Sequence, residues 1–123
     1  MTIRQAIARF DTLYPNEIPY EQKLAWLSEL DGIVYEEILS FYKEAPPTAF
    51  TGYILATPGD SQLLVPFPYD KIYIEYLSSK TELVRGNAER YNNAATLYAN
   101  TFDAFAADYN RTHTPLQNVQ VHF

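Results

Sequence analysis

The stretch from Pro66 to Tyr109 limits the possible folds of this chain more than any other part of it. After two closely spaced prolines, its second half carries apolar residues in alternating steps of four and three. These residues are Tyr91, Ala95, Tyr98, Phe102, Phe105 and Tyr109. This is the spacing of a heptad seam, which places one continuous apolar stripe on a helix. The sequence therefore predicts an amphipathic helix whose aromatic stripe is covered by this protein or by another.

The residues before this helix predict a second helix, and the join between the two has two interpretations. Pro68 suits the first turn of a helix, and Asp70 places a negative charge there. One helix from Pro68 to Asn110 would be about 64 Å long, too long for a compact chain of 14.2 kDa. Gly86 and Asn87 suit a helix end followed by a new N-cap. We therefore favour an antiparallel helical hairpin, with one continuous helix as the alternative. The predicted apolar face of the first helix of this pair consists of Ile72, Tyr73, Tyr76, Leu77, Leu83 and Val84.

Helical periodicity also marks the first third of the chain. Thr2 and Gln5 have the spacing of a capping box, and apolar residues then recur at helical intervals until the first proline. A second helical region runs from Tyr20 to about Lys43, with acidic and basic residues on its other face. Asp31-Gly32 interrupts this pattern, so we expect two helical pieces or one kinked helix.

Two other segments predict extended structure. Apolar residues 53–55 and 63–65 flank Pro58-Gly59-Asp60-Ser61, a sequence typical of a turn between two strands. Near the C-terminus, Val119, Val121 and Phe123 alternate with polar residues as in a strand. This end is either a disordered tail or a strand that adds to the sheet edge of a neighbouring molecule.

Together these patterns predict a mainly α fold, a small helical bundle of about four helices with a short β-hairpin between the second and third helical regions. We expect residues 1–112 to form a single helical domain, with the β-hairpin inserted near residues 53–65. Residues 113–123 are expected to form a C-terminal tail. A length of 123 residues agrees with one domain, which buries about two thirds of the surface of its unfolded chain.

The residue types offer little for catalysis. The chain has no cysteine, which excludes thiolate chemistry, disulfides and cysteine-ligated zinc. His113 and His122 lie in the predicted tail without the neighbours that a metal site needs. Adjacent carboxylates such as Glu36 and Glu37 point about 100° apart on a helix, as on a solvated face. We therefore expect no catalytic, cofactor-binding or metal-binding residue, and no enzymatic activity.

The composition points instead to contacts with protein. The net charge of −6 comes without a basic stripe, so the chain lacks the surface that non-specific binding of nucleic acid requires. No apolar run approaches the roughly 18 residues needed to cross a membrane. Aromatic residues reach 15%, and 11 of them are tyrosines, which suit half-buried and interfacial positions. The candidate protein-interaction residues are Tyr91, Tyr98, Phe102, Phe105, Tyr109, Phe67 and Tyr69.

Four stretches together carry a resemblance to a known family. They are Tyr14–Asn16, Lys23–Gly32, Leu63–Asp70 and Glu89–Asn93. In these stretches, and over nearly the whole chain, the sequence resembles head–tail connector (adaptor, head-completion) proteins of tailed bacteriophages and of prophages in Gram-positive bacteria. The motifs are structural, with no catalytic signature among them.

The resemblance implies a mostly helical subunit without enzymatic activity that forms a homo-oligomeric ring beneath the portal. Its partners would be copies of itself and the portal, tail or neck proteins, in the virion neck or in the host cytoplasm during assembly. DNA would pass through the ring without specific binding, and an acidic wall would repel its phosphates. The alternative is a small helical scaffolding or regulatory protein that binds one protein partner as a monomer or dimer.

Overall fold

The computed structural model describes residues 1–43, 45 and 49–116 of the 123-residue chain. Four α-helices and two short 3₁₀ helices make up its regular structure in these ranges, so the predicted mainly α fold is confirmed. They are α1 (Ile3–Leu13), α2 (Tyr20–Glu37), η1 (Leu39–Phe41), η2 (Tyr69–Lys71), α3 (Ile72–Arg85) and α4 (Ala88–Thr112).

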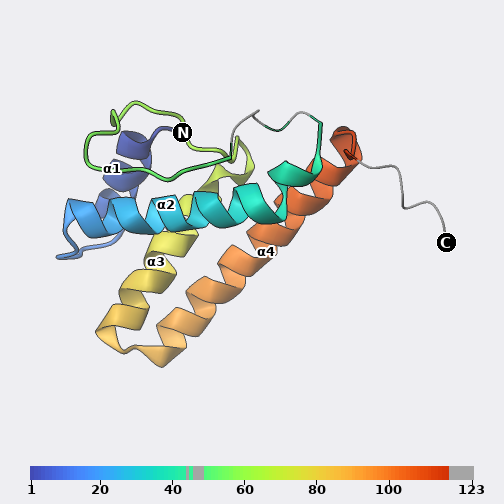
Figure 1. Cartoon of the computed structure of the whole chain (residues 1–123). Helices are drawn as coiled ribbons and strands as arrows, with labels where there is room; N and C mark the ends of the chain where they lie inside the picture. The colour runs from blue at the N-terminus through green and yellow to red at the C-terminus, as the bar shows by residue number, and fades with distance from the viewer. Residues whose placement is uncertain (44, 46–48, 117–123) are drawn as a thin grey trace.

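Helix α3 is the element on which the others pack. It contacts α1, α2 and α4, and it runs antiparallel to α4 while α2 crosses over the pair (Figure 1). Its side chains are accordingly buried on almost every side between Ile72 and Glu82. The core combines aliphatic residues of α1, α2, α3 and the loop before η2 with aromatic residues that include Phe10, Tyr73 and, from α4, Phe105.

The N-terminus of α1 follows the sequence closely. The Thr2 hydroxyl accepts a hydrogen bond from the Gln5 N–H at 3.1 Å, and the Gln5 side chain accepts from the Thr2 N–H at 2.9 Å. The predicted capping box is therefore confirmed. The apolar face of α1 buries Ile3, Ile7 and Phe10, because these residues recur at the helical period.

Helix α2 is continuous through Asp31-Gly32, so the prediction of two pieces divided at these residues is wrong. The predicted helical region up to about Lys43 instead divides after Glu37, where η1 follows. The break was inferred because aspartate and glycine often mark helix ends. Here the Asp31 side chain caps no helix and binds groups from two other segments instead. Packing of the buried α2 face outweighs the cost of one glycine, which is about 1 kcal/mol.

The β-hairpin predicted near residues 53–65 is also wrong, since no strand occurs in the part of the chain that the structure describes. Residues 49–68 form a loop over α1 and α2 (Figure 1). Part of its backbone binds the start of α1, where Ile3 N–H donates to Ser61 O at 3.1 Å and Arg4 N–H to Gly59 O at 2.8 Å. These bonds satisfy helix donors that have no partner inside the helix.

A single buried carboxylate binds several groups around the rest of the loop. Asp31, which is 0% exposed, accepts hydrogen bonds from the Tyr53 hydroxyl, the Leu64 N–H at 3.0 Å and the Tyr73 hydroxyl at 2.6 Å. The Tyr73 hydroxyl also accepts from the Val65 N–H at 2.7 Å. Burial raises the pKa of Asp31, and the three hydrogen bonds oppose this rise. Loop donors that would pair across a hairpin thus bind side chains of α2 and α3, which explains why no hairpin forms.

The turn between α3 and α4 confirms the helical hairpin and excludes the continuous helix. Gly86 has a φ of 75°, the left-handed conformation that commonly ends a helix. The Asn87 side chain then caps α4 by accepting from the Arg90 N–H at 3.0 Å. The turn extends beyond α1 and α2 (Figure 1). Leu83 and Val84 are therefore exposed there, which corrects their predicted place on the apolar face of this helix.

The chain after α4 returns to the end of α2. Lys43 N–H donates to Thr114 O at 3.0 Å, and Leu116 N–H donates to Phe41 O at 2.9 Å. An isolated antiparallel bridge joins Tyr42 to Pro115 between these bonds. The strand predicted for Val119, Val121 and Phe123 lies outside the described residues.

Gly86→Ala is expected to lower the free energy of unfolding by about 1 kcal/mol, because alanine is strained in the left-handed conformation. A Cβ at position 86 would meet no atom within 4 Å, so steric collision is not the cause. Urea unfolding measures the loss, and Gly86→Asn, which tolerates this conformation better, should lose less. Equal stability of Gly86→Ala and the wild type would contradict the prediction.

Asp31→Asn is expected to lower the free energy of unfolding by about 3 kcal/mol, because it weakens hydrogen bonds to a buried charge. Tyr53→Phe, which removes one of the three donors, should cost about 2 kcal/mol. Tyr35→Phe is the matched control, since the half-buried Tyr35 hydroxyl makes no hydrogen bond to a described residue. Chemical denaturation of all three variants tests the assignment, which fails if Asp31→Asn unfolds like Tyr35→Phe.

Candidate interaction surface

Most of the residues predicted to contact another protein turn inward. Phe105 is 2% exposed and packs against Tyr69 and Tyr109, with ring centroids 5.7 Å away in each case. Tyr98 packs against Tyr76 of α3 at 5.0 Å and against Phe102 at 6.0 Å. The aromatic seam of α4 is thus largely occupied by intramolecular packing, and its role in binding another protein stays a prediction.

The remaining candidates are more accessible. Phe67 is 83% exposed, the highest value among the large apolar side chains described. Tyr69 is half-buried because it packs on Phe105. Tyr91 is half-buried at the α3–α4 turn, where it lines a shallow hollow with Leu83 and Ala88.

A polar cluster joins α2 to α3 beside the seam. The Tyr76 hydroxyl donates to the Glu29 carboxylate, and the Lys80 ammonium lies 3.4 Å from the same carboxylate. Burial raises the pKa of Tyr98, and the charges of Glu37 and Glu29 add to that rise. Burial and the neighbouring carboxylates thus favour the protonated form of both phenols.

The exposed apolar residues that the sequence analysis missed lie away from the seam. Leu97, which immediately precedes Tyr98, is 54% exposed. Its exposure could have been predicted from the sequence, because Leu97 does not belong to the seam whose residues are spaced by four and three. An apolar residue outside the packed stripe of a helix faces solvent. Besides Phe67 and Leu97, the described large apolar side chains that are more than half exposed are Leu13, Phe41, Ile54, Leu55, Leu83, Val84 and Leu116.

Leu97 lies in a hollow on one face of the α3–α4 pair. This α3–α4 hollow has a volume of about 290 Å³. Its apolar walls come from the chain after α1 and from α4, and its two arginines come from α3 and α4. The hollow is defined by Tyr14, Pro15, Arg85, Arg90, Ala94 and Leu97, and Ser78, Glu82 and Asn93 also line it.

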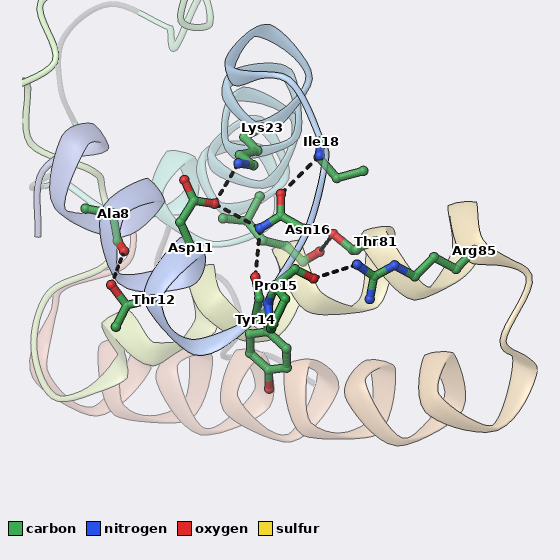
Figure 2. Close-up of polar contacts among 11 residues, drawn as sticks. Ala8, Asp11, Thr12, Tyr14, Pro15, Asn16, Ile18, Lys23, Thr81 and Arg85 are labelled. Carbon is green, nitrogen blue, oxygen red and sulfur yellow. Dashed lines mark hydrogen bonds and ion pairs between the residues drawn. The ribbon is translucent and has the colours of Figure 1, made fainter.

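Tyr14 and Pro15, which follow α1 and form one wall of the hollow, are held by hydrogen bonds on two sides. The Arg85 guanidinium donates to Pro15 O at 2.6 Å, and Tyr14 is directed toward α4 (Figure 2). On the other side, Asn16 donates to Tyr14 O at 2.8 Å and to the Asp11 carboxylate at 3.0 Å (Figure 2).

Asp11 also accepts from the buried Lys23 ammonium at 2.6 Å. Burial acts to raise the pKa of Asp11, but the bonds from Asn16 and Lys23 leave it lowered. The hollow therefore has a preformed wall.

The two arginines of the hollow differ in their partners. Arg85 lies 3.6 Å from the buried Glu82 carboxylate. Arg90 is exposed and makes no ion pair with any described residue. Glu89 precedes Arg90 but does not line the hollow. The hollow thus combines apolar walls and an internal Arg85–Glu82 pair with one cation, Arg90, that is available to an anionic group.

The residues considered for chemistry lie apart from one another. His113 stacks on Tyr109, with ring centroids 3.5 Å apart, and His122 lies outside the described residues. Asp108 pairs with Arg111 at 3.0 Å, while Glu36 and Glu37 are exposed. Across residues 1–43, 45 and 49–116, no group of three or more His, Asp or Glu side chains is placed to hold a metal ion.

The double variant Tyr98→Ala with Phe102→Ala is expected to lower the free energy of unfolding by about 3 kcal/mol, because both rings leave space beside Tyr76. Leu97→Ala on the same helix is the matched control and should change stability by less than about 0.5 kcal/mol. Thermal and urea unfolding of a dilute sample measure both. If the double variant is as stable and as assembled as the wild type, the seam has neither a packing nor a contact role.

The comparisons with known proteins add no relative. No protein-family model, curated protein or solved structure matches this chain. Among the described residues, no helix is both long enough and apolar enough to cross a bilayer. Inference about function therefore depends on the residues and surfaces of this chain itself.

Proposed function

We propose that this chain is a non-enzymatic structural protein of a tailed bacteriophage or prophage, a head–tail connector subunit that forms a homo-oligomeric ring between portal and tail. The family resemblance of the four sequence stretches supports this function. Two of these stretches are joined by the hydrogen bond from the Leu64 N–H to Asp31. The resemblance therefore includes residues that hold the body of the subunit together.

The observation that carries the proposal is the distribution of exposed apolar side chains. Phe41, Phe67 and Leu97 come from η1, from the end of the long loop and from α4, and each is more than half exposed. Single exposed apolar residues are ordinary, but large ones are favoured where proteins make contacts. A ring subunit touches two neighbours and also the components above and below it. Contacts on several faces suit this arrangement better than the alternative, a scaffolding or regulatory protein with one partner.

The charge of the chain is compatible with DNA passing through such a ring. With a net charge of −6, the protein offers few cations for releasing counterions from DNA. A negatively charged channel wall repels phosphates and lets DNA slide. The expected partners are copies of the same chain, the portal and the tail or neck proteins, in the virion neck.

Deletion of the gene from a phage or inducible prophage that carries it tests the proposal. The expected result is heads and tails that accumulate without joining, visible by negative-stain electron microscopy, with recovery when the wild-type chain is supplied in trans. Mass spectrometry of purified wild-type particles should detect the chain. Complete, infectious particles without the gene would overturn the connector function.

A further inference from the structure

We propose that copies of this chain associate head to tail, with the α3–α4 hollow of one copy receiving the opposite, acidic end of another. This acidic end is defined by Glu36, Glu37, Phe41 and Leu116. The inference deepens the proposed function, because it names the surfaces through which neighbouring subunits of a homo-oligomer meet.

The acidic end presents an apolar projection beside free carboxylates. Phe41 is 60% exposed, and the hydrogen bond from the Leu116 N–H to Phe41 O keeps the exposed Leu116 beside it. Glu36 and Glu37 form the last turn of α2, and neither makes an ion pair with a described residue. They outnumber the single lysine that follows them, Lys43. This end therefore offers an aromatic side chain next to negative charge.

The α3–α4 hollow offers the complementary properties. Tyr14, Ala94 and Leu97 give it apolar walls, and Arg90 places an unpaired cation at it. Its wall is held in place by the bond from Arg85 to Pro15 O. A preformed wall lowers the entropic cost of binding. An aromatic residue accompanied by a carboxylate is thus the kind of group that fits this hollow.

Phe41 and Leu116 of the acidic end are too far from the hollow of their own molecule to enter it. They lie beside the C-terminal end of α4, where the Tyr42 hydroxyl donates to Asn110 at 2.7 Å. The hollow uses α4 residues only up to Leu97. Twelve residues of helix separate Leu97 from Tyr109, a rise of about 18 Å. Insertion of Phe41 into a hollow therefore requires a second copy.

A contact between two different surfaces of identical chains is heterologous. Such contacts continue from copy to copy until the rotation closes a ring, or they build an open filament. A contact of one surface with itself would instead stop at a dimer. The charges also favour the heterologous pairing, because Arg90 meets Glu36 and Glu37 while two acidic ends would repel each other.

Two charge-reversal variants, studied alone and as a mixture, test the pairing of the hollow with the acidic end. The first variant is Arg90→Glu, and the second combines Glu36→Lys with Glu37→Lys. Sedimentation velocity over a concentration series should show the wild type growing beyond a dimer, and each variant alone should raise the dissociation constant about tenfold. In a mixture of the two variants, each hollow again meets an end of opposite charge, so association should return to about the wild-type level.

Matched controls separate this effect from a change in net charge. Arg9→Glu, and Glu21→Lys combined with Asp60→Lys, change the same charges at exposed positions outside both surfaces. These controls should associate as the wild type does, and far-UV circular dichroism should show that every variant is folded.

Several results would overturn the pairing. A wild type that stays monomeric at about 1 mM would do so, as would growth that stops at a dimer or a variant mixture no better associated than its components. Association only with another virion protein would also overturn it. Failure of the connector function gives a different result. In that case the pairing holds in solution, but complete phage particles assemble without the gene. If instead the gene is needed but both charge variants assemble normally, the connector function stands and the pairing fails.

Discussion

The Asp31 carboxylate is the group on which the described structure depends most. It is the meeting point of a helix, a loop and a second helix, through the Leu64 N–H and the hydroxyls of Tyr53 and Tyr73. An apolar residue at this place would leave the Leu64 N–H buried without an acceptor, at a cost of about 1–3 kcal/mol. Burial of the charge is unfavourable, and the three donors offset that cost. These hydrogen bonds therefore attach the loop to the core.

Attachment of the loop has consequences at the start of the chain. The same loop accepts hydrogen bonds from the first turn of α1 through Gly59 and Ser61. Helix α1 is in turn fastened to α2 through Asp11 and Lys23, and to α3 through Pro15 and Arg85. Polar contacts thus fix the helices around α3 in one arrangement, which hydrophobic burial alone specifies less sharply.

This arrangement also decides which apolar residues remain exposed. Because α1 and α2 end short of the α3–α4 turn, Leu83 and Val84 stay in solvent (Figure 1). Because α4 packs on α3 through one face only, Leu97 lies open in the α3–α4 hollow. Phe41 and Leu116 are exposed at the other end, where the chain after α4 meets η1. Exposed apolar residues therefore remain at the α3–α4 turn, in the hollow and at the end of η1.

The sequence by itself determined the features that depend on neighbouring residues. The capping box of Thr2 and Gln5 and the periodic helices are local, because each needs groups only a few residues apart. The sequence favoured a stop at Gly86-Asn87 over one continuous helix, and the structure shows that stop. Only the tertiary structure decided the course of residues 49–68, the continuity of α2 at Asp31, and the exposure of Leu83, Val84 and Leu97. Periodicity shows which face of a helix is apolar, but what covers that face depends on where other helices end. Likewise, the donors that Asp31 binds lie 22 to 42 residues away along the chain, beyond the reach of any local pattern.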